Sequence, residues 1–205
     1  MPPAPGRSLA LIRLATQGAE PNDKNPAATP APGWVGRGSP EPADHGLGRS
    51  RGGWTSKLHL ICDGRGRALS VGLTGGNVND TTMLGPALAD LRVPRRGPGR
   101  PRTTPDQLLG DKGYSSRANR ALLAGRGIVV TIPERADQLA NRARRGRAGG
   151  RPYAFDKCAY KGRNVGERAC NRLKQWRAIA TRYDKKAVNY RAGIVLASTI
   201  IRLTT

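Results

Sequence analysis

Two carboxylates in this chain have neighbours that could support metal-dependent chemistry, and the first is Asp111. It directly follows a short apolar run, Gln107–Gly110, and Gly113 lets the chain turn just after it. Ligands in open α/β sheets bind outside the carboxyl ends of strands, so an acid at this point is well placed to hold a metal ion. The alternative is an aspartate that only caps the next helix, and the local pattern does not separate the two.

The second carboxylate is Glu167, in a basic segment with helical periodicity. Tyr160, Arg163, Glu167 and Lys174 are separated by three, four and seven residues, which places them, with Asn171, on one stripe of a continuous helix. An opposite apolar stripe is expected to face the core and consists of Val165, Ala169, Leu173, Trp176 and Ala180. The spacing alone favours a solvated face with an Arg163–Glu167 ion pair over a catalytic acid.

The elements that would position these acids follow from the patterning after Trp54. Residues 54–62 alternate apolar and polar side chains, residues 63–67 read as a glycine-rich turn, and residues 68–74 as a second strand, which together predict a β-hairpin. Further elements are predicted as follows: a helix over 83–91 capped by Asn77, Asn79 or Asp80, a strand at 107–110, a helix capped by Ser115 or Ser116, a strand at 128–133, and two helical pieces over 160–203 hinged near 183–186. This order predicts one mixed α/β domain over residues 54–205.

Residues 1–53 have a different composition, rich in proline and glycine with little apolar periodicity. Such a composition buries too little apolar surface to offset the entropy of ordering the chain. We therefore expect a largely disordered N-terminal segment, with one short strand over residues 9–15 that contains no acid.

The charge indicates the class of partner. The chain carries 36 Lys and Arg against 14 Asp and Glu, a net charge of +22, which points to a polyanion such as nucleic acid and away from an acidic small-molecule enzyme. Arginine clusters over residues 92–102 and 142–151 are predicted to be flexible surface loops. No apolar run is long enough to span a membrane. Since the three cysteines form no CxxC pair, any metal site must use oxygen ligands. His59 is expected to be a hydrogen-bonded histidine of the sheet rather than a metal ligand.

Several ordered motifs together resemble one known family. GRSRGGWTSKLHL at 48–60, GDKGY at 110–114 and the signature Y-x2-R-x3-E-x6-K at 160–174 resemble the DDE transposases of bacterial insertion sequences. The ending NRLKQWRAIATRYDK is also similar to that group. The resemblance covers residues 44–203, and the matching order and intervals make it specific.

The resemblance implies an α/β fold with a ribonuclease-H-like mixed sheet flanked by helices. It also implies a carboxylate triad that holds two Mg²⁺ or Mn²⁺ ions for DNA strand cleavage and strand transfer. Asp111 matches the second acid and Glu167 the third, as catalytic residues and metal ligands. The DNA contacts expected from the signature and the arginine cluster are Tyr160, Arg163, Lys174, Arg144 and Arg145. The implied partner is double-stranded DNA, at the transposon ends and the target, bound by a homo-oligomer in the bacterial cytoplasm at the nucleoid.

The sequence departs from the family where the first acid of the triad should lie. That acid belongs to a first strand upstream of the GRSRGG segment, whereas Asp23 and Asp44 fall in coil and Asp63 falls in the hairpin turn. The catalytic domain is therefore expected to be N-terminally truncated or altered, and to be a partial or inactive product. The alternative function is a catalytically dead DNA-binding remnant. A basic RNA-binding protein would explain the charge but not the signature.

Overall fold

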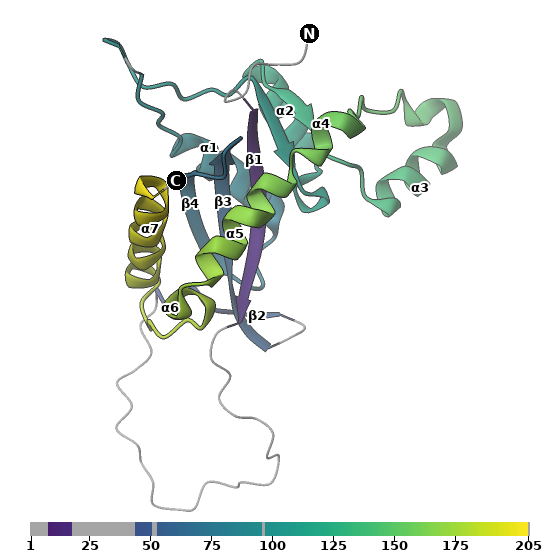
Figure 1. Cartoon of the computed structure of the whole chain (residues 1–205). Helices are drawn as coiled ribbons and strands as arrows, with labels where there is room; N and C mark the ends of the chain where they lie inside the picture. Colours follow the sequence, from purple (N-terminus) through teal and green to yellow (C-terminus); the bar gives the residue numbers. More distant parts are fainter. Residues whose placement is uncertain (1–7, 18–43, 51–52, 96, 205) are drawn as a thin grey trace, which may run out of the picture.

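The computed structural model describes residues 8–17, 44–50, 53–95 and 97–204. Within these residues six strands form one mixed sheet, with helices on both of its faces (Figure 1). The sheet runs in the order β4-β3-β1-β5-β6, and the short β2 (Gly48–Ser50) pairs with the first residues of β3. In this part of the chain no helix is long and apolar enough to cross a membrane.

The predicted hairpin is confirmed as β3 (Gly53–Asp63) and β4 (Ala68–Gly75), which pair antiparallel. Its turn is held by Asp63, whose Oδ1 accepts hydrogen bonds from the backbone N–H groups of Arg65 and Arg67 at 2.9 and 3.0 Å. β3 is buried on both faces over most of its length because helices cover both sides of the sheet.

The central strand of the sheet is β1 (Ser8–Gln17), which includes the strand predicted over residues 9–15. It pairs antiparallel with β3, from Leu9 opposite Asp63 to Gln17 opposite Thr55, and parallel with β5 (Gln107–Gly110). The predicted domain begins at residue 54, where the apolar alternation begins, and therefore leaves β1 out. The sequence does not indicate the pairing of β1, because its partners come from distant segments. The predicted disorder of residues 1–53 otherwise concerns positions that, apart from 44–50, lie outside the described residues.

The elements between β4 and β6 largely match the predictions. The helix expected over 83–91 is a 3₁₀ turn, η1 (Asp80–Met83), followed by α1 (Leu84–Ala89), and the side chain of Asn79 caps it by accepting from the Thr81 N–H. After β5 come η2 (Lys112–Tyr114) and α2 (Arg117–Gly125), where the Ser116 hydroxyl accepts from the Asn119 N–H as the N-cap. The last strand, β6 (Val129–Thr131), runs parallel to β5.

The second arginine cluster is not a flexible loop, and that prediction is wrong. Its first arginines belong to α3 (Ala136–Arg145), which leads into η3 (Gly146–Gly149). Arginine and alanine are good helix formers, and the Gln138 side chain caps the helix by accepting from the Arg135 N–H. The pair formed by Arg142 with Glu134 then holds this helix to the end of β6.

The C-terminal region has the predicted break near 183–186, but it has further breaks. The helices are α4 (Lys157–Lys161), α5 (Asn164–Lys174), α6 (Arg177–Ala180) and α7 (Ala187–Leu203). Because the chain turns at residues 162–163, Tyr160 and Glu167 lie on different helices, and one continuous stripe is the wrong picture. The predicted apolar stripe is buried at Ala169 and Leu173, but Trp176 lies beyond α5 and is exposed.

Two apolar clusters fill the two sides of the sheet. On one side Leu58, Leu60 and Cys62 of β3 pack with α5, α6 and α7. On the other side Ile61 of β3 and Leu108 of β5 pack with residues of α1 and α2. Burying each such leucine or isoleucine contributes about 1.5–3 kcal/mol, so alternate residues of β3 tie both helical layers to one sheet.

Candidate active site

Asp111 lies directly after β5 and caps the turn that follows. It ends a strand at the carboxyl edge of the sheet, and its Oδ1 accepts from the Lys112 N–H at 2.7 Å as the N-cap of η2. A glycine at 110 is needed because a Cβ there would come within 2.9 Å of Ile132 Cγ1. The turn after Asp111 is anchored by the fully buried Tyr114, whose hydroxyl lies 2.6 Å from Nδ1 of His59.

The junction of α4 and α5 brings the signature residues over this end of β5. A Cβ at Gly162 would lie 3.3 Å from Leu109 Cδ1, so the junction packs closely on the strand. Burial raises the pKa of the Tyr160 hydroxyl; Arg163 opposes that rise, and the nearby carboxylates of Asp111 and Glu167 add to it. Both acids therefore lie within electrostatic range of one hydroxyl.

Glu167 carries the predicted ion pair. Arg163 Nη2 lies 2.6 Å from Glu167 Oε1, and the guanidinium also stands over the Tyr160 ring at 5.3 Å. The Glu167 side chain is 48% exposed, so a pair of this kind adds only about 0.3–0.5 kcal/mol to stability. The Glu167 carboxylate is thus accessible to solvent and only weakly held by Arg163, as a carboxylate that must exchange one partner for another would need to be.

The other predicted DNA contacts are spread more widely. Lys174 lies seven residues after Glu167 in the same helix, about 10 Å further along its axis. Arg144 and Arg145 are exposed on α3, which forms an arm beside the sheet in Figure 1. The structure therefore brings Asp111, Tyr160, Arg163 and Glu167 together and leaves the remaining three basic residues apart.

The backbone register of β1 identifies the position nearest to Asp111 on the central strand. Leu11 pairs with Gly110 in parallel, so position 12 is level with Asp111. Ile12 pairs with Leu60, which faces α5, and Leu109 of β5 faces the α4–α5 junction. Position 12 thus belongs to the face of the sheet that carries Glu167, and the sequence of β1 holds no Asp or Glu.

The two acids are of the ligand type that binds a divalent ion, but there are few of them. Carboxylate oxygens are the ligands that Mg²⁺ prefers, and Asp111 and Glu167 supply them. Over the described part of the chain no group of three His, Cys, Asp or Glu residues is placed to hold a metal ion. Asp63 does not serve as a substitute, because Arg67 Nε donates to its Oδ2 at 2.7 Å within the hairpin turn.

The sequence suggests Asp80 only as a helix cap, whereas in the structure Asp80 forms a largely buried ion pair. Lys57 Nζ lies 3.0 Å from Asp80 Oδ1, and a Cβ at Gly113 would lie 3.1 Å from Asp80 Oδ2. The pair joins β3 to the turn that follows Asp111. The signal in the sequence is a lysine within the predicted strand over residues 54–62. His59 is hydrogen-bonded through both ring nitrogens, to Tyr114 and Thr74, which confirms the prediction of a hydrogen-bonded histidine of the sheet.

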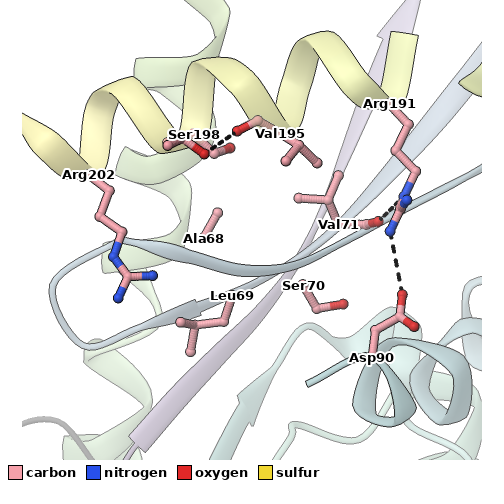
Figure 2. Close-up of a pocket in the computed structure, with 10 residues that line it drawn as sticks. Ala68, Leu69, Ser70, Val71, Asp90, Arg191, Val195, Ser198 and Arg202 are labelled. Carbon is pink, nitrogen blue, oxygen red and sulfur yellow. Dashed lines mark hydrogen bonds and ion pairs between the residues drawn. The ribbon is translucent and has the colours of Figure 1, made fainter. Parts of the chain in front are cut away.

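A cavity of about 400 Å³ lies elsewhere, between the edge strand β4 and α7 (Figure 2). There Arg191 Nε donates to the Val71 carbonyl at 2.8 Å, and its Nη2 lies 3.6 Å from Asp90 (Figure 2). In the sheet order β3 and β1 separate this edge from β5, and neither Asp111 nor Glu167 lines the cavity. Arg191 covers an otherwise open strand edge, which is a structural role.

The structure thus defines a mixed α/β protein with Asp111 at the carboxyl edge of its sheet and Glu167 on a covering helix, and comparison with known proteins gives the family. The family described as "Transposase DDE domain" matches residues 28–201, so the chain belongs to the DDE transposase family. A relative from Burkholderia cepacia, named as a putative transposase for insertion sequence element IS402, is 40% identical over 99 residues. That match covers 48% of this chain and 46% of the relative, so the chain spans about half of the relative's length. The resemblance to insertion-sequence transposases is confirmed.

Proposed function

We propose that this chain is the catalytic domain of an insertion-sequence transposase that binds transposon-end DNA and lacks the first acid of its triad. The sheet supports a ribonuclease-H-like fold, since three antiparallel strands are followed by two parallel ones in the order β4-β3-β1-β5-β6. In this proposal the domain comprises β1 together with residues 44–204.

The observation that carries the proposal is the register of β1. The level of Asp111 on the central strand is taken by Ile12, on the face of the sheet that α5 covers. An acid there would stand beside Asp111 and Glu167 and complete a set of three. The proposal is that the chain keeps the second and third acids and has an apolar residue in place of the first.

The remaining residues would bind and orient DNA. Arg163 and Lys174 offer cations on the helix that carries Glu167, and phosphate contacts of this type position a duplex without reading its sequence. Bound divalent ions would supply activation of the attacking oxygen and stabilisation of the leaving oxygen. Asp111 and Glu167 would be their ligands. The net charge of +22 supports double-stranded DNA as the partner. The proposal further takes the active form to be a homo-oligomer in the bacterial cytoplasm.

The test measures binding and cleavage together. The full chain is mixed with a labelled duplex carrying the end of its own element, with Mg²⁺ or Mn²⁺. We expect salt-dependent binding with little or no strand cleavage, because two carboxylates are few ligands for two divalent ions. Robust cleavage by the unaltered chain that is lost on Glu167→Gln would refute the missing acid.

A second candidate is a DNA-binding remnant that no single acid can restore to activity. It is favoured by the lack, among the described residues, of a third acid near Asp111 and Glu167. The two candidates differ in one result, since only a domain that is otherwise intact would regain cleavage when an acid is placed at position 12. The family match gives no support to an RNA-binding function.

A further inference from the structure

A second cavity, of about 260 Å³, lies between the first turn of α2, helix α3 and the segment before α4. Four arginines line it, Arg117, Arg120, Arg142 and Arg145, together with the carboxylate of Glu134 and the ring of Tyr153. The lining therefore carries a clear excess of positive charge.

Arg120 is the most deeply placed of these cations, at 8% exposed. Its Nη2 donates to the Ile132 carbonyl at 2.7 Å and to Ser115 Oγ at 3.2 Å, while its Nε is buried and has no hydrogen-bond partner among the described residues. Burial lowers the pKa of this guanidinium, and Glu134 only partly opposes that effect. A buried charged donor without a partner is unfavourable, and an anion in the cavity would supply that partner.

The carboxylate in the cavity is already used. Arg142 donates to both oxygens of Glu134, at 2.5 and 2.6 Å, which raises the pKa of Arg142. The Tyr153 ring lies beneath the guanidinium of Arg120 at 4.1 Å and beneath that of Arg142 at 5.3 Å, and so holds the two cations on one wall. Arg117, Arg120 and Arg145 are left without a carboxylate within the lining.

The cavity adjoins the edge of the sheet that carries Asp111. Glu134 comes three residues after the end of β6, whereas Asp111 follows β5 directly, and the parallel pairing of Leu109 with Thr131 puts the ends of both strands at the same edge. Neighbouring strands are about 4.8 Å apart, so Asp111 and the residues that follow β6 belong to the same end of the sheet, with α2 on one of its faces and α5 on the other.

We propose that this cavity binds a backbone phosphate of the DNA whose cleavage site lies at Asp111 and Glu167, with Arg117, Arg120 and Arg145 as its donors. Guanidinium groups suit phosphate because they donate two parallel hydrogen bonds to its oxygens. The assignment of the phosphate to DNA rests on the proposed function, whereas the affinity for the anion does not.

The experiment titrates the full chain with inorganic phosphate by calorimetry and, separately, with a labelled DNA duplex over a range of salt concentrations. Arg145→Gln removes one cation of the cavity, and Arg126→Gln is the matched control, because Arg126 is exposed at the end of α2 and does not line the cavity. We expect Arg145→Gln to weaken phosphate binding at least tenfold and to reduce the slope of log K against log salt for DNA by about 1, with neither effect in the control. Equal effects of the two variants would overturn the proposal.

Glu134→Gln gives a result of opposite sign. Loss of this carboxylate should tighten phosphate binding several-fold, because it frees Arg142 and removes a repulsive charge, and circular dichroism would verify that the variant is folded. Weaker phosphate binding by the folded variant would contradict the inference. Phosphate binding that depends on Arg145, without any DNA binding, would refute the proposed function and the DNA assignment but keep the anion site. DNA binding that is unaffected by Arg145→Gln would refute the inference alone.

Discussion

Ile12→Asp should supply the third carboxylate that, among the described residues, is lacking beside Asp111 and Glu167. Position 12 is level with Asp111 and pairs with the fully buried Leu60 of β3. Placing a carboxylate opposite a buried leucine and near two other acids should cost about 2–5 kcal/mol of unfolding free energy without metal.

A bound ion should return part of that loss. At a free metal concentration one hundred times its dissociation constant, binding stabilises the folded state by about 2.7 kcal/mol. We therefore expect Mn²⁺ or Mg²⁺ to stabilise Ile12→Asp by an amount of this order. Much less stabilisation is expected for the unaltered chain, which offers two acids at this place.

The assay is urea unfolding followed by circular dichroism, with and without Mn²⁺, using Ile12→Asn as the matched control. The asparagine has nearly the same shape and polarity but no charge. Ile12→Asp should also gain DNA cleavage, and adding Glu167→Gln should abolish that gain. If Ile12→Asp and Ile12→Asn respond equally to Mn²⁺, the placement of the first acid at position 12 is refuted.

Three further predictions concern the hairpin, the thiols and the basic loop. Burial of Asp63 opposes its ionisation, but hydrogen bonds from Arg67 and from the Arg65 backbone outweigh this and lower its pKa below 3.8. Asp63→Asn should therefore cost about 1–3 kcal/mol at pH 7 in urea unfolding, and the difference should disappear as the pH falls through the folded-state pKa; a constant difference down to pH 2 would contradict it. Iodoacetamide should label the exposed Cys158 in the folded protein well before the buried Cys62 and Cys170, since burial raises the pKa of Cys170 to about 11; peptide mass mapping checks this, and equal labelling would refute it. Replacing the arginines within residues 92–102 by glutamine should flatten the salt dependence of DNA affinity by several units, at about 0.9 per lost phosphate contact, and an unchanged slope would show that this loop does not touch DNA.

Elements whose signals are local could be predicted from the sequence. The β3–β4 hairpin follows from alternation around a glycine-rich turn, and α2 follows from a serine that caps its first N–H groups. The Arg163–Glu167 pair was also predictable, because residues four apart on a helix are neighbours whatever surrounds them. The sequence also indicates the class of partner, because the net charge follows from composition and does not depend on the fold.

The sequence predicts poorly those elements whose partners are far away along the chain. The sequence predicts a loop over residues 142–151 because the arginine cluster contains no acid, yet the pairing of Arg142 with Glu134, an acid outside the cluster, holds α3 in place. The helical periodicity does not predict the break at residues 162–163 for a similar reason. The break occurs where the chain packs on Leu109 of β5, and such a long-range contact leaves no periodic pattern in the sequence.

The candidate site depends most on the tertiary structure. The motif match identified Asp111 and Glu167, but only the packing of α4 and α5 on β5 brings both to the hydroxyl of Tyr160. In the same way, β1 showed no acid in its sequence, but only its pairing with β3 and β5 puts Ile12 level with Asp111. The physical reason is that the residue types record what each position can donate or accept, whereas distances between segments far apart in the chain are set by strand pairing and core packing after the chain has folded.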